Sequence, residues 1–175
     1  MRTPFRLIPA LLVLLATAQT PPPQLPPLQG RYCASVPLPP RTQVGTCGAL
    51  EVWTPRGILR LAVVTSEQLR EKGLMFVREV PRGQGMLFVF PGGDQPLNFW
   101  MKDTITPLDM VFVDHAGRVT SIAAAVPATT PSTPDEQIPR RSGTGAFVIE
   151  LASGDAARFG LAAGVRLLLP SIPAQ

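Results

Sequence analysis

Several charged and polar side chains in this sequence stand among large apolar residues. They are Arg70, Lys102, Thr104, Asp109 and Glu150. Because an unpaired charge is costly to bury, we expect Lys102 to pair with Asp109 or with Glu150. We expect Arg70 to pair with whichever of these two carboxylates does not pair with Lys102. In this interpretation, which we favour, the polar cluster is structural and stabilises the fold.

The same side chains could instead line a small concave pocket. Strand alternation places Phe99 on one face of its strand and Trp100 and Lys102 on the other. The two aromatic rings would wall the pocket, and an ammonium or guanidinium group would bind an anionic or polyhydroxyl ligand. The candidate ligand-binding residues are therefore Arg70, Phe99, Trp100, Lys102, Thr104, Asp109 and Glu150.

Most sequence signatures of catalysis are missing. The chain has no G-x-S-x-G elbow, no phosphate-binding glycine loop and no H-E-x-x-H motif. Two carboxylates can also do glycosidase chemistry, so a hydrolase or lyase that uses Asp109, Glu150 and Lys102 is the enzymatic alternative. We expect a protein without enzymatic activity and assign no catalytic residue.

Metal and cofactor chemistry has little support in the sequence. Three thioethers can bind Cu(I), and Met75, Met86 and Met101 occur in three neighbouring segments. Methionine is more commonly a flexible core residue, and each of these lies beside Leu, Phe or Trp. The single His115 falls in an expected turn, where we expect it to be exposed, and it leaves no Cys/His set for zinc. We assign no metal and no cofactor.

The candidate residues must be positioned by short strands. Apolar runs and alternation bounded by Gly and Pro predict eight strands and two short helices. Ser66 and Gly73 are typical of the start and the end of the first helix. The predicted strands are 49–54, 58–65, 86–90, 97–101, 110–113, 118–126, 146–151 and 165–169, and the predicted helices are 67–72 and 154–159. This pattern predicts a mostly β fold, a sandwich or barrel, over residues 49–173.

Residues 127–145 form the longest stretch without a predicted element inside the domain. The segment is rich in Pro, Thr, Ser and Gly and carries charges of both signs. A loop of this length inside a compact domain is either functional or disordered, and both interpretations stay open. We expect the neighbouring Arg140 and Arg141 to be a solvated pair in this loop.

The basic character of the chain comes from its N-terminal part. The formal net charge is +4 and the isoelectric point is near 9.8. All 12 acidic residues follow Leu50, but only 12 of the 16 basic residues do so. Nucleic-acid binding needs a clustered basic face on the folded domain. We therefore expect no nucleic-acid partner.

The first 18 residues have the three-part order of a secretory signal peptide. Two arginines precede the apolar run Leu7 to Leu15, and Ala16-Thr17-Ala18 is a small-residue cleavage site. An apolar run this short does not span a bilayer, which needs about 20 residues. We expect cleavage after Ala18, no stable membrane span afterwards, and a periplasmic or extracellular protein; a retained anchor is the alternative.

Residues 19–48 read as a tail rather than as part of the domain. Proline pairs and triplets there favour extended polyproline II, which acts as a stiff spacer or, alternatively, as a P-x-x-P ligand. Cys33 and Cys47 are the two cysteines of the chain. In an oxidising compartment they predict a disulfide, which would contribute about 3 kcal/mol in the chain-entropy model.

Four ordered motifs resemble the domain-of-unknown-function family 192. They are Arg70 with Gly73-Leu74-Met75, Gly85-Met86-Leu87-Phe88-Val89-Phe90, Asn98 to Thr104 running into Pro107-Leu108-Asp109, and Val148-Ile149-Glu150-Leu151. The resemblance spans about residues 50–169. It implies a jelly-roll-like, mostly β sandwich from a family without an established activity.

These observations lead to one functional expectation with two alternatives. We expect a monomeric, non-enzymatic, extracytoplasmic binding or accessory domain whose partner is a small polar or carbohydrate-like molecule or an envelope component. The alternatives are the Asp109, Glu150 and Lys102 enzyme and a structural envelope protein that acts through its tail and its long loop.

Overall fold

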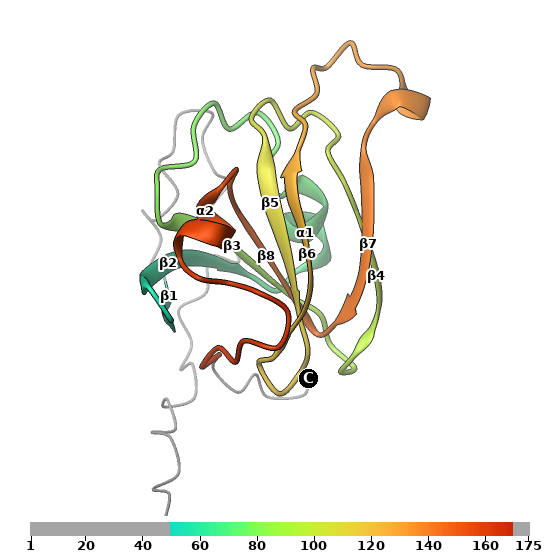
Figure 1. Ribbon diagram of the computed structural model, residues 1–175. Helices are drawn as coiled ribbons and strands as arrows, with labels where there is room; N and C mark the ends of the chain where they lie inside the picture. The colour runs from blue at the N-terminus through green and yellow to red at the C-terminus, as the bar shows by residue number, and fades with distance from the viewer. Residues whose placement is uncertain (1–49, 170–175) are drawn as a thin grey trace, which may run out of the picture.

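The computed structural model describes residues 50–169 (Figure 1). Three kinds of element follow one another along this part of the chain. They are β1 (Leu50–Thr54), β2 (Gly57–Val64), α1 (Glu67–Lys72), β3 (Gln84–Val89), β4 (Gln95–Trp100), β5 (Leu108–Val113), β6 (Val119–Val126), the 3-10 helix η1 (Asp135–Gln137), β7 (Arg140–Gly145), β8 (Phe147–Ala152) and α2 (Asp155–Arg158). Within this range, no helix has the length and apolar character needed to cross a bilayer. The signal segment and both cysteines lie outside the described residues.

Six strands form one open sheet, and two form a separate ribbon. The sheet order is β1-β2-β3-β8-β5-β6, and its pairs are antiparallel except for β2 and β3, which are parallel. α1 lies in the connection between these two parallel strands, as parallel pairing requires a crossover. The ribbon pairs β4 with β7 and forms a second layer beside β5 and β6 (Figure 1). The fold is a mostly β, sandwich-like structure with two short helices, as predicted, and the strands of residues 50–169 close no barrel.

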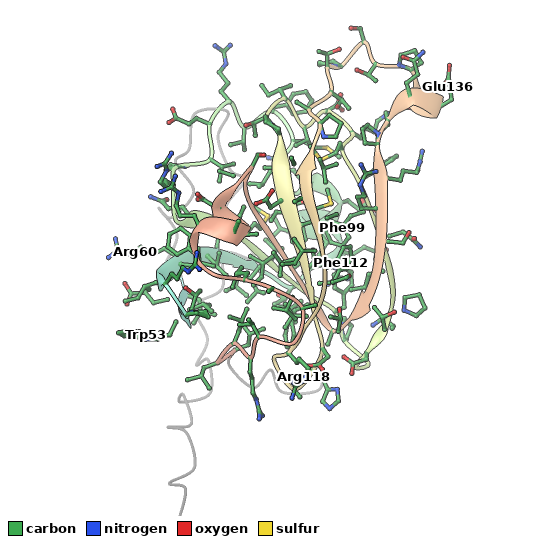
Figure 2. All side chains as sticks on the ribbon, in the orientation of Figure 1. Trp53, Arg60, Phe99, Phe112, Arg118 and Glu136 are labelled. Atoms are coloured by element: carbon green, nitrogen blue, oxygen red, sulfur yellow. The ribbon has the colours of Figure 1, made fainter. Side chains whose placement is uncertain are left out.

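Each face of the sheet carries its own core. The ribbon-facing core lies between the sheet, α1 and the ribbon, and its centre is an aromatic contact between Phe99 of β4 and Phe112 of β5, whose rings are 6.1 Å apart (Figure 2). The opposite core lies beneath α2 and the segment that follows it, with Ala156, Leu161 and Leu167 among its members. Alternation along each strand divides its side chains between these two cores.

α1 begins and ends where the sequence predicts. The Ser66 hydroxyl accepts a hydrogen bond from the Leu69 N–H at 3.4 Å, which is the N-cap interaction. The helix ends at Gly73, whose φ of 45° suits glycine and whose N–H donates to the Leu69 carbonyl at 2.9 Å. The chain then turns away from the helix axis and forms one wall of the site described below.

Two predictions about elements are wrong. Residues 140–145, expected in a loop, form strand β7, so Arg140 and Arg141 lie on the ribbon. The strand escapes prediction because glycine occupies an inward position: a Cβ on Gly143 would lie 2.4 Å from Phe112. Residues 165–169, expected as a strand, form only a single bridge between Arg166 and Arg118.

Candidate functional site

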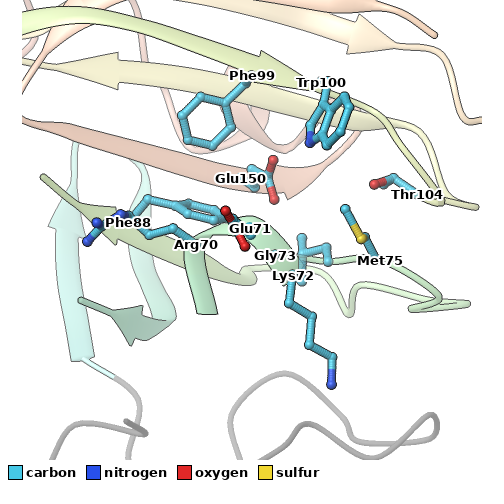
Figure 3. Close-up of a pocket in the computed structure, with 11 residues that line it drawn as sticks. Arg70, Glu71, Lys72, Gly73, Met75, Phe88, Phe99, Trp100, Thr104 and Glu150 are labelled. Carbon is cyan, nitrogen blue, oxygen red and sulfur yellow. The ribbon is translucent and has the colours of Figure 1, made fainter. Parts of the chain in front are cut away.

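A small pocket lies where α1 and the turn after it meet β3, β8 and the end of β4 (Figure 3). Its volume of about 30 Å³ is enough for roughly two water molecules. Three aromatic rings, a thioether, a hydroxyl, two carboxyls and two basic side chains contribute to its wall. The lining residues are Arg70, Glu71, Lys72, Gly73, Leu74, Met75, Phe88, Phe99, Trp100, Thr104 and Glu150.

Glu150 is the unusual residue of this pocket. It lies on β8 directly between Met86 of β3 and Met110 of β5, so its side chain belongs to the ribbon-facing side of the sheet. Only 5% of the residue is exposed. Among residues 50–169, no hydrogen bond or ion pair to its carboxyl is found. No fully enclosed side-chain oxygen or nitrogen in this range lacks a partner, so the Glu150 oxygens are accessible from the pocket. Figure 3 shows this carboxyl directed into the pocket, below Phe99 and Trp100.

Burial raises the pKa of the Glu150 carboxyl from its ordinary value of 4.5 to about 8. The cause is desolvation, because a charged carboxylate among apolar groups loses its hydration without gaining a partner. At neutral pH the side chain is therefore mostly protonated. In that form it offers one O–H donor and one acceptor oxygen to the pocket.

Phe99 joins the pocket to the core. Its ring packs edge-to-face against Phe88, with centroids 5.0 Å apart, and against Phe90, with centroids 6.0 Å apart. Such contacts fix the position of a ring more firmly than apolar burial alone. The aromatic wall is thus held in place by the same packing that attaches the ribbon to the sheet.

The segments next to the pocket carry exposed aromatic side chains and residues with unusual backbone dihedral angles. Trp100 is 40% exposed and Phe76 is 47% exposed. Phe76 and Asp103 both have positive φ, 61° and 53°, and the Phe76 N–H donates to the Asp103 carbonyl at 2.8 Å. Positive φ in non-glycine residues stores strain that concentrates at functional sites. This link connects the turn after α1 to the chain that leaves β4, one residue away from the lining residues Met75 and Thr104.

The predicted pairing of the charged cluster is wrong. Lys102 pairs with Asp135 at 3.1 Å in an exposed position. Arg70 donates to the main-chain carbonyls of Thr65 and Val89 and lies over the ring of Phe90. Main-chain carbonyls and a surface carboxylate satisfy the two cations, so neither needs a buried carboxylate.

Asp109 has a different environment from the predicted one. Its carboxylate accepts hydrogen bonds from the N–H groups of Ala125, Gly154 and Ala156 at 2.8, 2.9 and 2.9 Å. It lies opposite Leu151 in the register of β5 and β8. Asp109 therefore points to the α2 side of the sheet and Glu150 to the ribbon side. The structure does not bring Asp109, Glu150 and Lys102 together.

Of the seven predicted site residues, five line the pocket: Arg70, Phe99, Trp100, Thr104 and Glu150. Lys102 lies outside the lining but close to it, because its amine sits 5.6 Å from the centre of the Trp100 ring. The prediction missed Phe88, Met75 and the main chain around Gly73. Their signal was present, since Gly73-Leu74-Met75 and the strand that contains Phe88 are two of the recognised motifs.

Comparison with protein families agrees with these motifs. The family model DUF192, described as "Uncharacterized ACR, COG1430", matches residues 52–169. The chain belongs to this family. The four motif segments that resemble DUF192 each contribute residues to the pocket: Gly73 to Met75; Phe88; Phe99, Trp100 and Thr104; and Glu150.

Two solved structures are similar to this DUF192 chain. A protein of Sinorhizobium meliloti 1021, provisionally named a transcription regulator, is 33% identical with a TM-score of 0.55, over 67% of this chain and 88% of that one. A protein of unknown function from Novosphingobium aromaticivorans DSM 12444 is 30% identical with a TM-score of 0.52, over 67% of this chain and 81% of that one. The chain has no significant match among functionally curated proteins.

The metal hypothesis gains nothing from the structure. Of the three methionines considered for Cu(I), only Met75 lines the pocket, whereas Met86 and Met101 are fully buried in the ribbon-facing core. Residues 50–169 contain no cluster of three His, Cys, Asp or Glu side chains. His115 is exposed in its turn and its Nδ1 lies 2.6 Å from Asp94, an interaction that raises the pKa of His115.

Proposed function

We propose that this DUF192 domain is a non-enzymatic binding domain that takes one small polar group of its ligand into the Glu150 pocket. The observation that supports the proposal is the Glu150 carboxyl itself, which is buried, without a partner among the described residues, and directed into the pocket. The Glu150 oxygens are accessible from the pocket, because no fully enclosed side-chain oxygen or nitrogen among residues 50–169 lacks a partner. A ligand that enters the pocket can therefore form a direct hydrogen bond with this carboxyl.

The surroundings of Glu150 favour binding over catalysis. General acid–base chemistry on a substrate commonly uses two groups with separated pKa values. The only other fully buried carboxylate on β5 or β8, Asp109, is directed to the opposite face of the sheet and is held by three N–H groups. The rest of the lining consists of aromatic rings, Met75, Thr104 and charged side chains of α1.

We place this function outside the cytoplasm. The support is the signal-like segment over residues 1–18, followed by the proline-rich spacer and the predicted Cys33–Cys47 disulfide. The provisional name of the Sinorhizobium meliloti protein suggests transcription regulation. The export signal and the equal numbers of acidic and basic residues after Leu50 favour a small-molecule or envelope partner instead.

Mass spectrometry of co-purifying compounds tests this proposal. The exported protein would be purified from the bacterial envelope as wild type, as Glu150→Gln and as Glu51→Gln, and bound molecules would be extracted and identified. Glu51 is a matched control because it forms an exposed ion pair with Arg60 on the edge of the sheet. We expect a compound that is enriched in the wild type and in Glu51→Gln but reduced in Glu150→Gln. An identical set of compounds in all three samples contradicts the proposed site.

A further inference from the structure

We propose that the group bound in this pocket is an alkylammonium, with the Glu150 carboxylate as its counter-ion and the rings of Phe99 and Trp100 beside it. This inference rests on the proposed function and specifies its ligand class. It follows from the kinds of atoms that line the pocket and from the charges that do not reach Glu150.

The lining is chemically suited to an ammonium group. Phe88, Phe99 and Trp100 contribute aromatic rings and Met75 contributes a polarizable sulfur. Aromatic rings attract cations electrostatically, and more strongly when water is excluded. An ammonium carries donors and no acceptor, and the lining offers it the oxygens of the Glu150 and Glu71 carboxyls and of the Thr104 hydroxyl, beside the indole nitrogen of Trp100. Thr104 is the hydroxyl, and its oxygen lies on the side of the residue that faces the pocket (Figure 3).

Trp100 already holds cations of this chain. The Lys102 amine lies 5.6 Å and the Arg140 guanidinium 5.5 Å from the centre of its ring. Arg140 is the direct neighbour of Trp100 across the ribbon. The electrostatic field of this ring therefore attracts positive groups in the protein itself, although neither of these two cations lines the pocket.

The charges around Glu150 leave its counter-ion position open to a ligand. On α1, the Arg70 guanidinium is held by two carbonyls, and the Arg70 and Lys72 side chains extend away from Glu150 in Figure 3. Glu71, on the same helix, adds a negative charge to the lining. On the ribbon side, Lys102 pairs with Asp135. Neighbouring strands β3 and β5 place Met86 and Met110 beside Glu150, so no titratable group faces it from the sheet.

Proton release accompanies this binding step. At neutral pH the protonated Glu150 loses its proton to solvent as R–NH3⁺ enters, and the resulting carboxylate accepts a hydrogen bond from the ammonium. Because burial raises the pKa of Glu150 to about 8, affinity increases with pH below that value and becomes constant above it. A neutral ligand that accepts a hydrogen bond from protonated Glu150 shows the opposite dependence.

Titration with n-butylammonium chloride and with 1-butanol tests the inference. An alkylammonium resembles a lysine side chain, whose pKa is about 10.4, so it stays charged between pH 6 and 9. The readout is the fluorescence of Trp100 in a Trp53→Phe background, which removes the other tryptophan, with sodium chloride added to keep ionic strength constant. We expect butylammonium to bind about tenfold more tightly at pH 7 than at pH 6, with little change from pH 8.5 to 9. We expect 1-butanol to bind more weakly throughout.

Two variants separate this inference from the proposed function. Glu150→Gln should weaken butylammonium binding and remove its pH dependence, whereas Glu51→Gln should leave both unchanged. If 1-butanol binds as tightly as butylammonium and neither depends on pH, the ammonium inference is overturned while a neutral-ligand pocket stands. If neither probe binds, the ammonium inference is also overturned, and the co-purification experiment decides the proposed function on its own.

Discussion

The two faces of the central sheet treat a buried carboxyl group in opposite ways. On the α2 side, Asp109 is 1% exposed and accepts three main-chain hydrogen bonds, two of them from the start of α2. On the ribbon side, Glu150 is 5% exposed and has no partner among the described residues. Burial alone therefore does not decide how a carboxyl is satisfied. The fold supplies the partners of Asp109, whereas the proposed function assigns that role at Glu150 to a ligand.

Among substitutions at Asp109, Glu150 and Lys102, replacement of Asp109 should cause the largest loss of stability. Asp109→Ala leaves three N–H groups without their acceptor, and hydrogen bonds to a charged group contribute about 1.5–3 kcal/mol each. We expect the free energy of unfolding to fall by roughly 5 kcal/mol, measured by urea denaturation at pH 7. Asp109→Asn, which keeps one acceptor oxygen, should lose less. A loss below about 1 kcal/mol in Asp109→Ala would remove the structural role assigned to this residue.

Replacement of Glu150 should affect stability in a pH-dependent way. Folding raises the pKa of this carboxyl from 4.5 to about 8, so between these values the unfolded chain has lost a proton that the folded chain keeps. The contribution of Glu150 to the free energy of unfolding thus falls as pH rises, by roughly 1.4 kcal/mol per pH unit. Above pH 8 this contribution is constant. Glu150→Gln removes this dependence.

The measurement compares both proteins by urea denaturation at pH 5, 6, 7 and 8. We expect Glu150→Gln to gain stability relative to the wild type by about 4 kcal/mol across this range, and Glu51→Gln to show no such trend. Parallel stability curves for the wild type and Glu150→Gln would mean that a partner already satisfies the carboxyl in solution.

Replacement of Lys102 should change stability the least. If it neutralised a buried carboxylate, Lys102→Met would cost about 3–5 kcal/mol. The structure instead pairs it with Asp135 at the surface, where an ion pair contributes about 0–1 kcal/mol. We expect the melting temperature of Lys102→Met to differ little from that of the wild type. A large loss would restore the pairing between Lys102 and a buried carboxylate that the sequence suggested.

The sequence predicts the elements better than it predicts the polar contacts. Apolar runs located seven of the eight strands, and Ser66 and Gly73 located α1, because these signals are local. β7 was missed because Gly143 lies where Phe112 leaves no room for a side chain, so the apolar alternation of a strand is absent there.

The relation between the two carboxyls depends on a long-range register. Asp109 and Glu150 lie on different strands, and pairing of Met110 with Glu150 sends the two side chains to opposite faces. A shift of one residue would have placed them on the same face. No local pattern fixes that choice, which explains why the sequence favoured a shared polar cluster. The aromatic wall was recognised because Phe99 and Trp100 are adjacent in one motif.

The hydrogen bond between Phe76 and Asp103 joins the two layers of the fold beside the pocket. One side of the pocket belongs to α1 and the sheet, and the other belongs to β4 of the ribbon. In the proposed function, a bound molecule contacts both layers at once and stabilises their association. By mass action, occupancy raises the free energy needed to separate the ribbon from the sheet. Conversely, separation of the ribbon from the sheet would weaken binding of the proposed ligand, so ligand binding and closure of the sandwich would be thermodynamically coupled.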